Sequence, residues 1–171
     1  MKRIIAFLVF AFAISAAAFS QTPSFRGRGY KGSVSYTNML IVWNGLDTSH
    51  GFMFDERHYL GVGAGFYLVP DGLDFPTIVH LYADYHAYCF EKASTLVAGI
   101  KIGYVDSVHP STGNIKALEL EPNIGWNWGL KSGQGLTLSL GACMMAVPIR
   151  FTESSSLPFT VVPRLCLAFE F

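Results

Sequence analysis

The chain ends with the residues Val161-Val162-Pro163-Arg164-Leu165-Cys166-Leu167-Ala168-Phe169-Glu170-Phe171. From Arg164 onward, every second residue is apolar: Leu165, Leu167, Phe169 and Phe171. The positions between them hold Arg164, Cys166, Ala168 and Glu170. Successive side chains of a β-strand point to opposite faces of the sheet. This alternation therefore predicts a strand with one apolar and one mostly polar face, ending on an aromatic residue.

The first twenty residues have the pattern of a secretory signal peptide. Lys2 and Arg3 precede an apolar core over residues 4–14, and Ala18-Phe19-Ser20 offers small side chains at the positions read by a signal peptidase. The apolar core is shorter than the roughly 20 residues of a spanning helix. We expect residues 1–20 to be the signal peptide, cleaved between Ser20 and Gln21, and residues 21–171 to form one domain.

The composition of the chain narrows its class. Residues 21–171 have the size of a single domain. The chain is 51% hydrophobic and 14% charged, and its formal net charge is zero. A soluble domain carries about 25% charged residues, and a neutral chain gives no reason to expect nucleic acid as a partner. An exported, aromatic, weakly charged chain without helical spans fits a barrel whose wall faces lipid.

Alternating apolar and polar residues, separated by turn signals, predict eight strands. The pair Asn44-Gly45 is a strong hairpin signal, because both central residues of such a turn need positive φ. In the third strand, apolar residues alternate with Gly61, Gly63 and Gly65, which would leave room inside a narrow barrel. The expected strands cover about residues 30–42, 46–54, 59–68, 76–90, 95–105, 115–128, 136–147 and 159–171.

A series of short motifs runs through this region in a fixed order. They are Gly29-Tyr30-Lys31-Gly32, Thr48-Ser49-His50-Gly51-Phe52, Gly61-Val62-Gly63-Ala64-Gly65, Tyr82-Ala83-Asp84, Gly99-Ile100-Lys101-Ile102-Gly103-Tyr104, Glu121-Pro122-Asn123-Ile124-Gly125 and Phe169-Glu170-Phe171. Their order and spacing make the region 30–171 resemble the small porin-like outer-membrane barrels of the OmpA and OmpX type. Pro163 departs from the pattern, because proline removes a hydrogen-bond donor from the last strand.

The resemblance implies a fold, a location and an assembly signal. The fold would be an all-β, eight-stranded, antiparallel, up-and-down transmembrane β-barrel in the outer membrane of a Gram-negative cell envelope. The C-terminal aromatic residues Phe169 and Phe171 would form part of the signal read by the barrel assembly machinery. Other partners would be outer-membrane lipid and an unknown extracellular molecule, and the protein would be a monomer.

The connections between the expected strands differ in length. The second, fourth and sixth are compact, at residues 55–58, 91–94 and 131–135, and the third, fifth and seventh are longer, at about 69–75, 106–114 and 147–158. In a barrel with both termini in the periplasm, even-numbered connections lie on the periplasmic side and are short. The longer loops would then meet the extracellular partner. The tight first hairpin departs from this rule.

The face opposite the apolar one collects ionisable side chains. A buried charge without a partner is costly, so we expect Asp84 beside Lys101, and Lys101 near Glu119 or Glu121, to belong to a salt-bridged network that plugs the lumen. The expected interior residues are Lys31, Asp47, His80, Tyr82, Asp84, His86, Lys101, Glu119, Glu121, Arg164 and Glu170.

Other interpretations of these interior groups remain open. They could line a small pore or relay protons. The carboxylates could form a glycosidase pair, or could bind a metal together with His80 and His86. Alternation places the polar residues of neighbouring strands on one face without any such function, and eight strands leave little room for water. We therefore expect no catalytic residue, no metal and no cofactor.

Aromatic residues on the apolar face are expected near the two membrane interfaces, where the ring is apolar and its polar atom meets water. They are Tyr36, Phe66, Tyr85, Trp126, Trp128, Phe169 and Phe171. Lipid A deacylases are barrels of similar length with a catalytic His and Ser on the lipid face. Here alternation sends Ser49 and His50 to opposite faces, and Thr48, which shares a face with His50, has no evident acid partner.

The three cysteines are Cys89, Cys143 and Cys166. Their odd number and wide spacing speak against a disulfide scaffold or a metal site, although Cys143 and Cys166 fall on the same face of neighbouring strands and a bridge between them stays open. The sequence as a whole predicts a non-enzymatic outer-membrane barrel with an envelope-structural or surface-interaction role. The alternatives are a small pore and a secreted, lipocalin-like barrel with an apolar interior.

Overall fold

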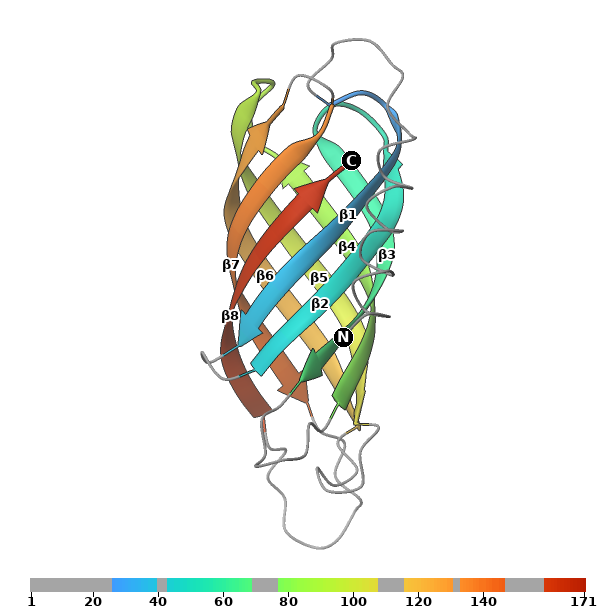
Figure 1. The fold of residues 1–171 in the computed structure, drawn as a ribbon, viewed down its shortest axis with the longest axis vertical. Coiled ribbons are helices and arrows are strands. Elements are labelled where there is room, and N and C mark those ends of the chain that lie inside the picture. Colours follow the sequence, from blue (N-terminus) through green and yellow to red (C-terminus); the bar gives the residue numbers. More distant parts are fainter. Residues whose placement is uncertain (1–25, 40–42, 69–76, 108–115, 131–132, 147–158) are drawn as a thin grey trace, which may run out of the picture.

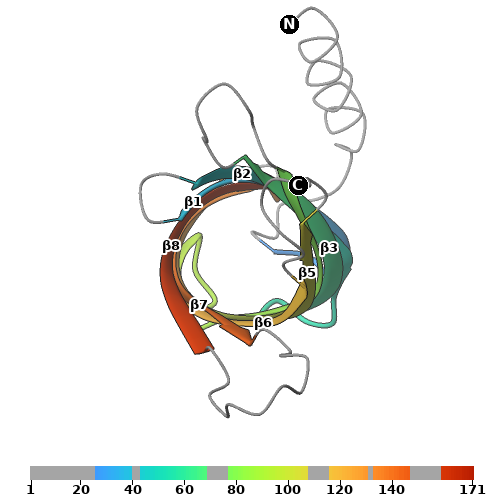
Figure 2. The same cartoon turned by 90° about the horizontal axis from the view of Figure 1, so that it is seen from below.

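The computed structural model describes residues 26–39, 43–68, 77–107, 116–130, 133–146 and 159–171. These residues form eight strands: β1 (Gly29–Met39), β2 (Trp43–Met53), β3 (His58–Leu68), β4 (Thr77–Tyr88), β5 (Ser94–Ser107), β6 (Lys116–Gly129), β7 (Gly135–Ala146) and β8 (Phe159–Glu170). Each strand pairs antiparallel with the next and β8 pairs with β1, so the sheet closes (Figures 1 and 2). The predicted eight-stranded up-and-down barrel is confirmed. The described residues contain no helix long and apolar enough to span a membrane.

The two faces of the wall differ in chemistry, as the alternation predicted. In β8, Leu165 and Leu167 are exposed on the outside, while Arg164, Cys166 and Glu170 are buried inside. Large apolar side chains are exposed on every strand. The closed interior holds both the buried polar groups and two smaller apolar clusters at opposite ends of the barrel.

The glycines of β3 make room for side chains inside the barrel. A Cβ built on Gly63 would lie 2.3 Å from the ring of Tyr82, and one on Gly65 would lie 2.0 Å from a carboxylate oxygen of Asp47. These separations are far below van der Waals contact. Interior side chains of the neighbouring strands therefore occupy the space that larger residues in β3 would need, as the sequence predicted.

The terminal residue closes the seam between β1 and β8. The amide of Phe171 donates to the carbonyl of Gly32 at 2.9 Å, and the amide of Gly32 donates to the carbonyl of Phe171 at 2.8 Å. The ring of Phe171 lies so close to Gly32 that a Cβ there would meet it at 2.7 Å. The last residue thus extends the strand pairing of the barrel by one step.

The predicted turn at Asn44-Gly45 is wrong. Both residues lie within β2, where they pair with Asn38 and Thr37 of β1. Positive φ among the described glycines occurs only at Gly29 and Gly133. Gly45 serves a different need, because a Cβ on it would lie 2.5 Å from the ring of Tyr67. The glycine therefore permits a close approach of β3 and does not shape a turn.

Two prolines lie within strands, and they affect the pairing differently. The β7–β8 register runs through Pro163, which faces Ala142, without a slip, and the pairing of β8 with β1 extends only to Arg164. In β6, by contrast, pairing with β7 is interrupted at Glu121 and Pro122, between Leu120 and Asn123. A missing amide donor explains such a gap.

The other strand boundaries differ from expectation by a few residues. β5 extends through Asp106 and Ser107, which the sequence assigned to a loop. The expected long loops at 69–75 and 147–158, and the rest of the loop at 106–114, lie outside the described residues. A bridge between Cys143 and Cys166 is excluded: all three cysteines are free, and Cys143 faces Val162 whereas Cys166 faces Ser139. The residue opposite Cys143 therefore lies four residues along β8 from Cys166, about 13 Å away, which is too far for a disulfide.

Candidate functional site: the barrel interior

The eleven predicted interior residues all project into the barrel, from six of its eight strands. Ten of them are buried, and His86 is half-buried. They are contributed by β1 (Lys31), β2 (Asp47), β4 (His80, Tyr82, Asp84 and His86), β5 (Lys101), β6 (Glu119 and Glu121) and β8 (Arg164 and Glu170). The structure arranges them in three groups along the barrel axis.

Arg164 is the centre of the first group and has no exposed surface. One guanidinium nitrogen donates to Asp47 of β2, and another donates to Glu121 and lies 3.4 Å from Glu119, both in β6. The guanidinium also lies over the ring of Tyr67, 5.4 Å from its centroid. A single arginine thus connects three strands of the barrel through charge-assisted hydrogen bonds, which are stronger than neutral ones.

His80 joins two of the same carboxylates. Its Nε2 lies 2.8 Å from Asp47 Oδ1 and its Nδ1 lies 3.2 Å from Glu119 Oε2. A carboxylate only accepts hydrogen bonds, so both contacts are satisfied when both ring nitrogens carry a proton. The geometry therefore suits a positively charged imidazole held between two carboxylates.

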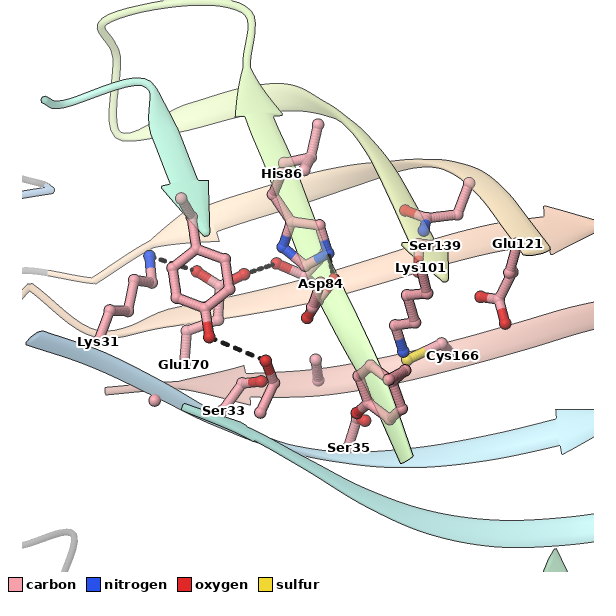
Figure 3. Close-up of a pocket in the computed structure, with 18 of the residues that line it drawn as sticks. Lys31, Ser33, Ser35, Asp84, His86, Lys101, Glu121, Ser139, Cys166 and Glu170 are labelled. Atoms are coloured by element: carbon pink, nitrogen blue, oxygen red, sulfur yellow. Dashed lines mark hydrogen bonds and ion pairs between the residues drawn. The ribbon is translucent and has the colours of Figure 1, made fainter. Parts of the chain in front are cut away.

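The second group surrounds Asp84 and Lys101 near the middle of the barrel (Figure 3). These residues face each other in the register of β4 and β5, as expected. His86 Nε2 lies 3.0 Å from Asp84 Oδ1, whereas the ammonium of Lys101 lies 3.8 Å from Asp47, across the lumen. The same ammonium lies 4.7 Å from the centroid of the Tyr82 ring. Ion pairs in this barrel thus reach across the interior as well as along its wall.

The third group lies at the end of the barrel where β1 begins and β8 ends. Lys31 Nζ lies 2.7 Å from Glu170 Oε2, and the hydroxyl of Tyr88 donates to the same oxygen at 3.0 Å. Arg26, which precedes β1, reaches inside and donates to Asn127 at 2.8 Å. Arg26 was not predicted to lie in the interior, because a residue outside the strands carries no alternation signal.

The buried charges of the described residues come close to balance. Five carboxylates face four basic side chains, so a neutral His80 would leave one excess negative charge and a protonated His80 would leave none. The carboxylates are Asp47, Asp84, Glu119, Glu121 and Glu170, and the bases are Arg26, Lys31, Lys101 and Arg164. Compensation of this kind is what a low-dielectric interior requires.

The space left between these side chains is small. A cavity of about 30 Å³ lies among residues of the second and third groups, including Lys31, Asp84 and Lys101 (Figure 3). This volume corresponds to about one water molecule. The side chains, rather than solvent, fill the middle of the barrel.

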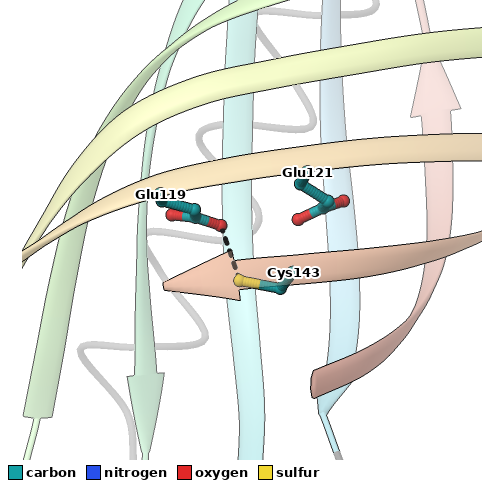
Figure 4. A group of neighbouring side chains, drawn as sticks. All are labelled: Glu119, Glu121 and Cys143. Carbon is teal, nitrogen blue, oxygen red and sulfur yellow. Dashed lines mark hydrogen bonds between the residues drawn. The ribbon is translucent and has the colours of Figure 1, made fainter. Parts of the chain in front are cut away.

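One cluster resembles a metal site in its donor set. Ligand atoms of Glu119, Glu121 and Cys143 lie within 4.8 Å of one another (Figure 4). However, both carboxylates already contact Arg164, and the thiol of Cys143 donates to Glu119 at 3.3 Å. The guanidinium occupies the position that a cation would need, so we do not assign a metal to this cluster.

The outer face carries a hydrogen-bonded group around His50. Its Nε2 lies 2.8 Å from Thr48 Oγ1 and its Nδ1 lies 2.6 Å from the hydroxyl of Tyr30. Thr48 Oγ1 also donates to the carbonyl of Ser33 at 3.1 Å. Because the threonine proton goes to the carbonyl of Ser33, His50 donates to Thr48 and accepts from Tyr30, so it does not act as a base toward the threonine. The group also differs from a catalytic triad in that a phenol, and not a carboxylate, contacts the other nitrogen of the histidine.

Five of the seven aromatic side chains predicted on the apolar face are exposed there, and Phe169 and Phe171 are half-buried. Tyr36, Phe66, Tyr85, Trp126 and Trp128 are exposed, at 37% to 49% of their surface. Trp126 and Trp128 lie near the last residues of β6. Phe171 is half-buried because its ring packs toward Gly32 and lies 6.4 Å from the ring of His50.

Comparison with known proteins supports the fold. No protein-family model and no curated protein sequence matches the chain. Among solved structures, the chain is similar to the N-terminal β-barrel domain of Pseudomonas aeruginosa OprF, with a TM-score of 0.51 and 12% identity over 85% of this chain and 98% of that one. It is also similar to Neisserial surface protein A, with a TM-score of 0.51 and 8% identity over 88% of this chain and 97% of that one. The chain therefore has the fold of the small eight-stranded outer-membrane barrels.

Proposed function

We propose that the protein is an integral outer-membrane β-barrel without enzymatic activity. Its role would be structural in the cell envelope or would consist of surface interactions through its longer loops. One observation carries this proposal: an apolar outer wall on every strand surrounds an interior of buried, mutually compensated charges. This is the arrangement that lipid outside and a filled lumen inside require.

The exposed apolar surface is the argument for the membrane. Soluble monomers rarely expose contiguous apolar patches larger than a few hundred Å². Here the exposed side chains include Val62 at 68%, Leu118 at 65% and Leu81 at 61% of their surface. A lipocalin-like barrel would have apolar residues inside and charges outside. The charged interior around Arg164 and His80 is opposite to that arrangement.

Export and assembly belong to the same proposal. A cleaved signal peptide over residues 1–20 would direct the chain out of the cytoplasm, and the assembly machinery would read the C-terminal aromatics Phe169 and Phe171. The backbone pairing of Phe171 with Gly32 supports a role in closing the barrel. The monomer needs no partner strand, because a closed barrel has no free edge.

The filled interior favours a structural role over conduction. The ion pairs of Arg164, His80 and Lys31 cross or line the lumen, and the cavity between the groups holds about 30 Å³. The test is conductance of the purified, folded protein in a planar lipid bilayer. We expect no discrete current steps above those of protein-free detergent. Reproducible steps of one amplitude would instead establish a small pore.

A further inference from the structure

The interior of the barrel is apolar at the end where β1 ends and β8 begins, where a water-facing mouth would normally be polar. Seven buried residues form a cluster there, each at most 3% exposed. They are Met39, Tyr67, Ile78, Val105, Ala117, Cys143 and Val162, with Trp43 and Met145 packed against them. The outer face is apolar at the same level, as Leu68 and Val161 show. The strands are thus apolar on both faces at this end, which contact with lipid does not explain.

A cavity of about 190 Å³ lies within this cluster. The residues that line it are Met39, Trp43, Tyr67, Ile78, Val105, Met145, Glu119, Cys143 and Thr160. An apolar cavity of about 150 Å³ stays dry and holds one benzene molecule. The volume here is therefore suited to a single aromatic ring with a small substituent.

Tyr67, one of the residues that line the cavity, carries an unsatisfied polar group. Tyr67 is 3% exposed, and within the part of the chain that the structure describes its hydroxyl makes no hydrogen bond. A buried polar atom without a partner is unfavourable. A ligand that fills the cavity and presents one hydroxyl or carbonyl oxygen would satisfy this group.

We propose that this cavity, which we call the mouth cavity, binds one small monocyclic aromatic molecule that carries a single hydrogen-bonding group, such as a phenol. The ring contacts the methionine, isoleucine and valine side chains, and the polar atom pairs with the hydroxyl of Tyr67. Beyond it, the ion pairs of Arg164 and His80 close the barrel, so the mouth cavity is a binding site and not a passage. Binding in the mouth cavity is a property in addition to the structural role, and it is expected of the folded barrel in detergent.

Methionine methyl groups provide the test. In the folded protein labelled with ¹³C-methyl methionine, Met39 and Met145 line the mouth cavity, whereas Met53 belongs to the apolar cluster at the other end. Phenol should cause saturable shifts of the Met39 and Met145 signals and leave Met53 unchanged. Shifts that grow linearly without saturation, or that affect Met53 equally, would overturn the proposal, because they indicate partition into the micelle.

Two variants test whether phenol binds in the mouth cavity. Val105→Phe fills the mouth cavity and should abolish the saturable shifts, while Val161→Phe adds the same bulk on the exposed outer face and should preserve them. Both variants are first shown to be folded by their resistance to detergent before heating. Saturable binding that survives Val105→Phe would contradict the proposal.

The hydrogen bond to Tyr67 has its own readout. Phenol should bind more tightly than toluene by about 2- to 10-fold, the range of one net hydrogen bond. Tyr67→Phe should remove this difference and retain toluene binding. An equal affinity of the original protein for phenol and toluene would show that the hydroxyl takes no part.

Discussion

At the scale of single residues, the interior depends on a few side chains with several partners each. Arg164 contacts Asp47 and Glu121 at once, and His80 contacts Asp47 and Glu119. Because the same carboxylates are shared, removal of one cation affects several strands. Replacement of a whole buried ion pair can be neutral, but removal of one partner leaves an uncompensated charge.

Arg164→Met should therefore be strongly destabilising. It keeps much of the side-chain volume but leaves Asp47 and Glu121 without their main cation. We expect the free energy of unfolding to fall by about 3–5 kcal/mol. Arg164→Lys is the matched control, since it retains the charge without the forked geometry and should cost less. Urea titration of the protein folded into lipid vesicles, followed by tryptophan fluorescence, measures the free energy of unfolding of both variants. Equal stability of the methionine variant and the original protein would contradict the role assigned to Arg164.

Gly65→Ala tests the close packing of the interior. The added methyl group would lie 2.0 Å from Asp47 Oδ1 and 2.4 Å from His80 Nε2, and would separate that pair. Overpacking of this kind costs about 1–3 kcal/mol. Ala64→Val adds more volume to the adjacent outward position and should be nearly neutral. The same urea titration measures the free energy of unfolding of both variants. A larger loss for Ala64→Val than for Gly65→Ala would show that the faces of β3 are assigned the wrong way round.

The face of each charged residue could be predicted from sequence, but its partner could not. Alternation alone assigns Asp84, Lys101 and Glu121 to the interior. Contacts across the lumen depend on the stagger between strands, which the sequence does not reveal. Lys101 therefore pairs with Asp47 from a distant strand, although Asp84 and Glu121 are its neighbours in register.

At the scale of elements, β8 and its seam with β1 complete the barrel. The two backbone hydrogen bonds between Phe171 and Gly32 extend this seam beyond the strand itself. On the outer face, Leu167 lies in the second half of β8, opposite Tyr36 of β1 and Leu138 of β7. One strand thus contributes both closure and lipid-facing surface.

Deletion of Phe171 should impair assembly. It removes two seam hydrogen bonds and the terminal aromatic ring, so we expect less folded protein in the outer membrane and more degraded or unfolded chain. Phe171→Tyr, which keeps the backbone and an aromatic ring, is the control and should assemble normally. Immunoblotting of outer-membrane fractions at equal expression gives the result. Unchanged abundance of the deletion variant would count against an assembly signal at this position.

Leu167→Arg places a charge on the outer wall of β8. For a lipid-facing position near the bilayer midplane, the expected loss of folding free energy is about 2–4 kcal/mol. Leu167→Phe keeps the position apolar and should change stability far less. Folding into vesicles of neutral lipid, measured by urea titration, compares the two. If arginine were tolerated as well as phenylalanine, Leu167 would not face lipid.

Element types were predictable, whereas turns and strand ends were less so. Alternation identified every strand, because one face of each is apolar over most of its length. The Asn44-Gly45 signal failed because the same dipeptide also suits a strand in which a bulky ring crosses the glycine. Tyr67 crosses Gly45 here. Such a long-range contact leaves no local trace in the sequence.

At the scale of the whole molecule, the outside is apolar and the inside is charged in the middle of the barrel. Composition and the alternating pattern predicted this arrangement, since a weakly charged, aromatic chain needs an apolar environment for its outer face. The apolar mouth around Met39, Tyr67 and Val105 was not predicted. There both faces of the strands are apolar, and alternation gives no signal.

Electrophoretic mobility shows whether this chain is a folded barrel in the outer membrane. Outer-membrane fractions are run in detergent with and without boiling. A closed barrel with all strands paired resists detergent at room temperature, so we predict a faster band before heating and a slower band afterwards. A single unshifted band, with the protein found in the soluble fraction, would show that the chain is not an outer-membrane barrel.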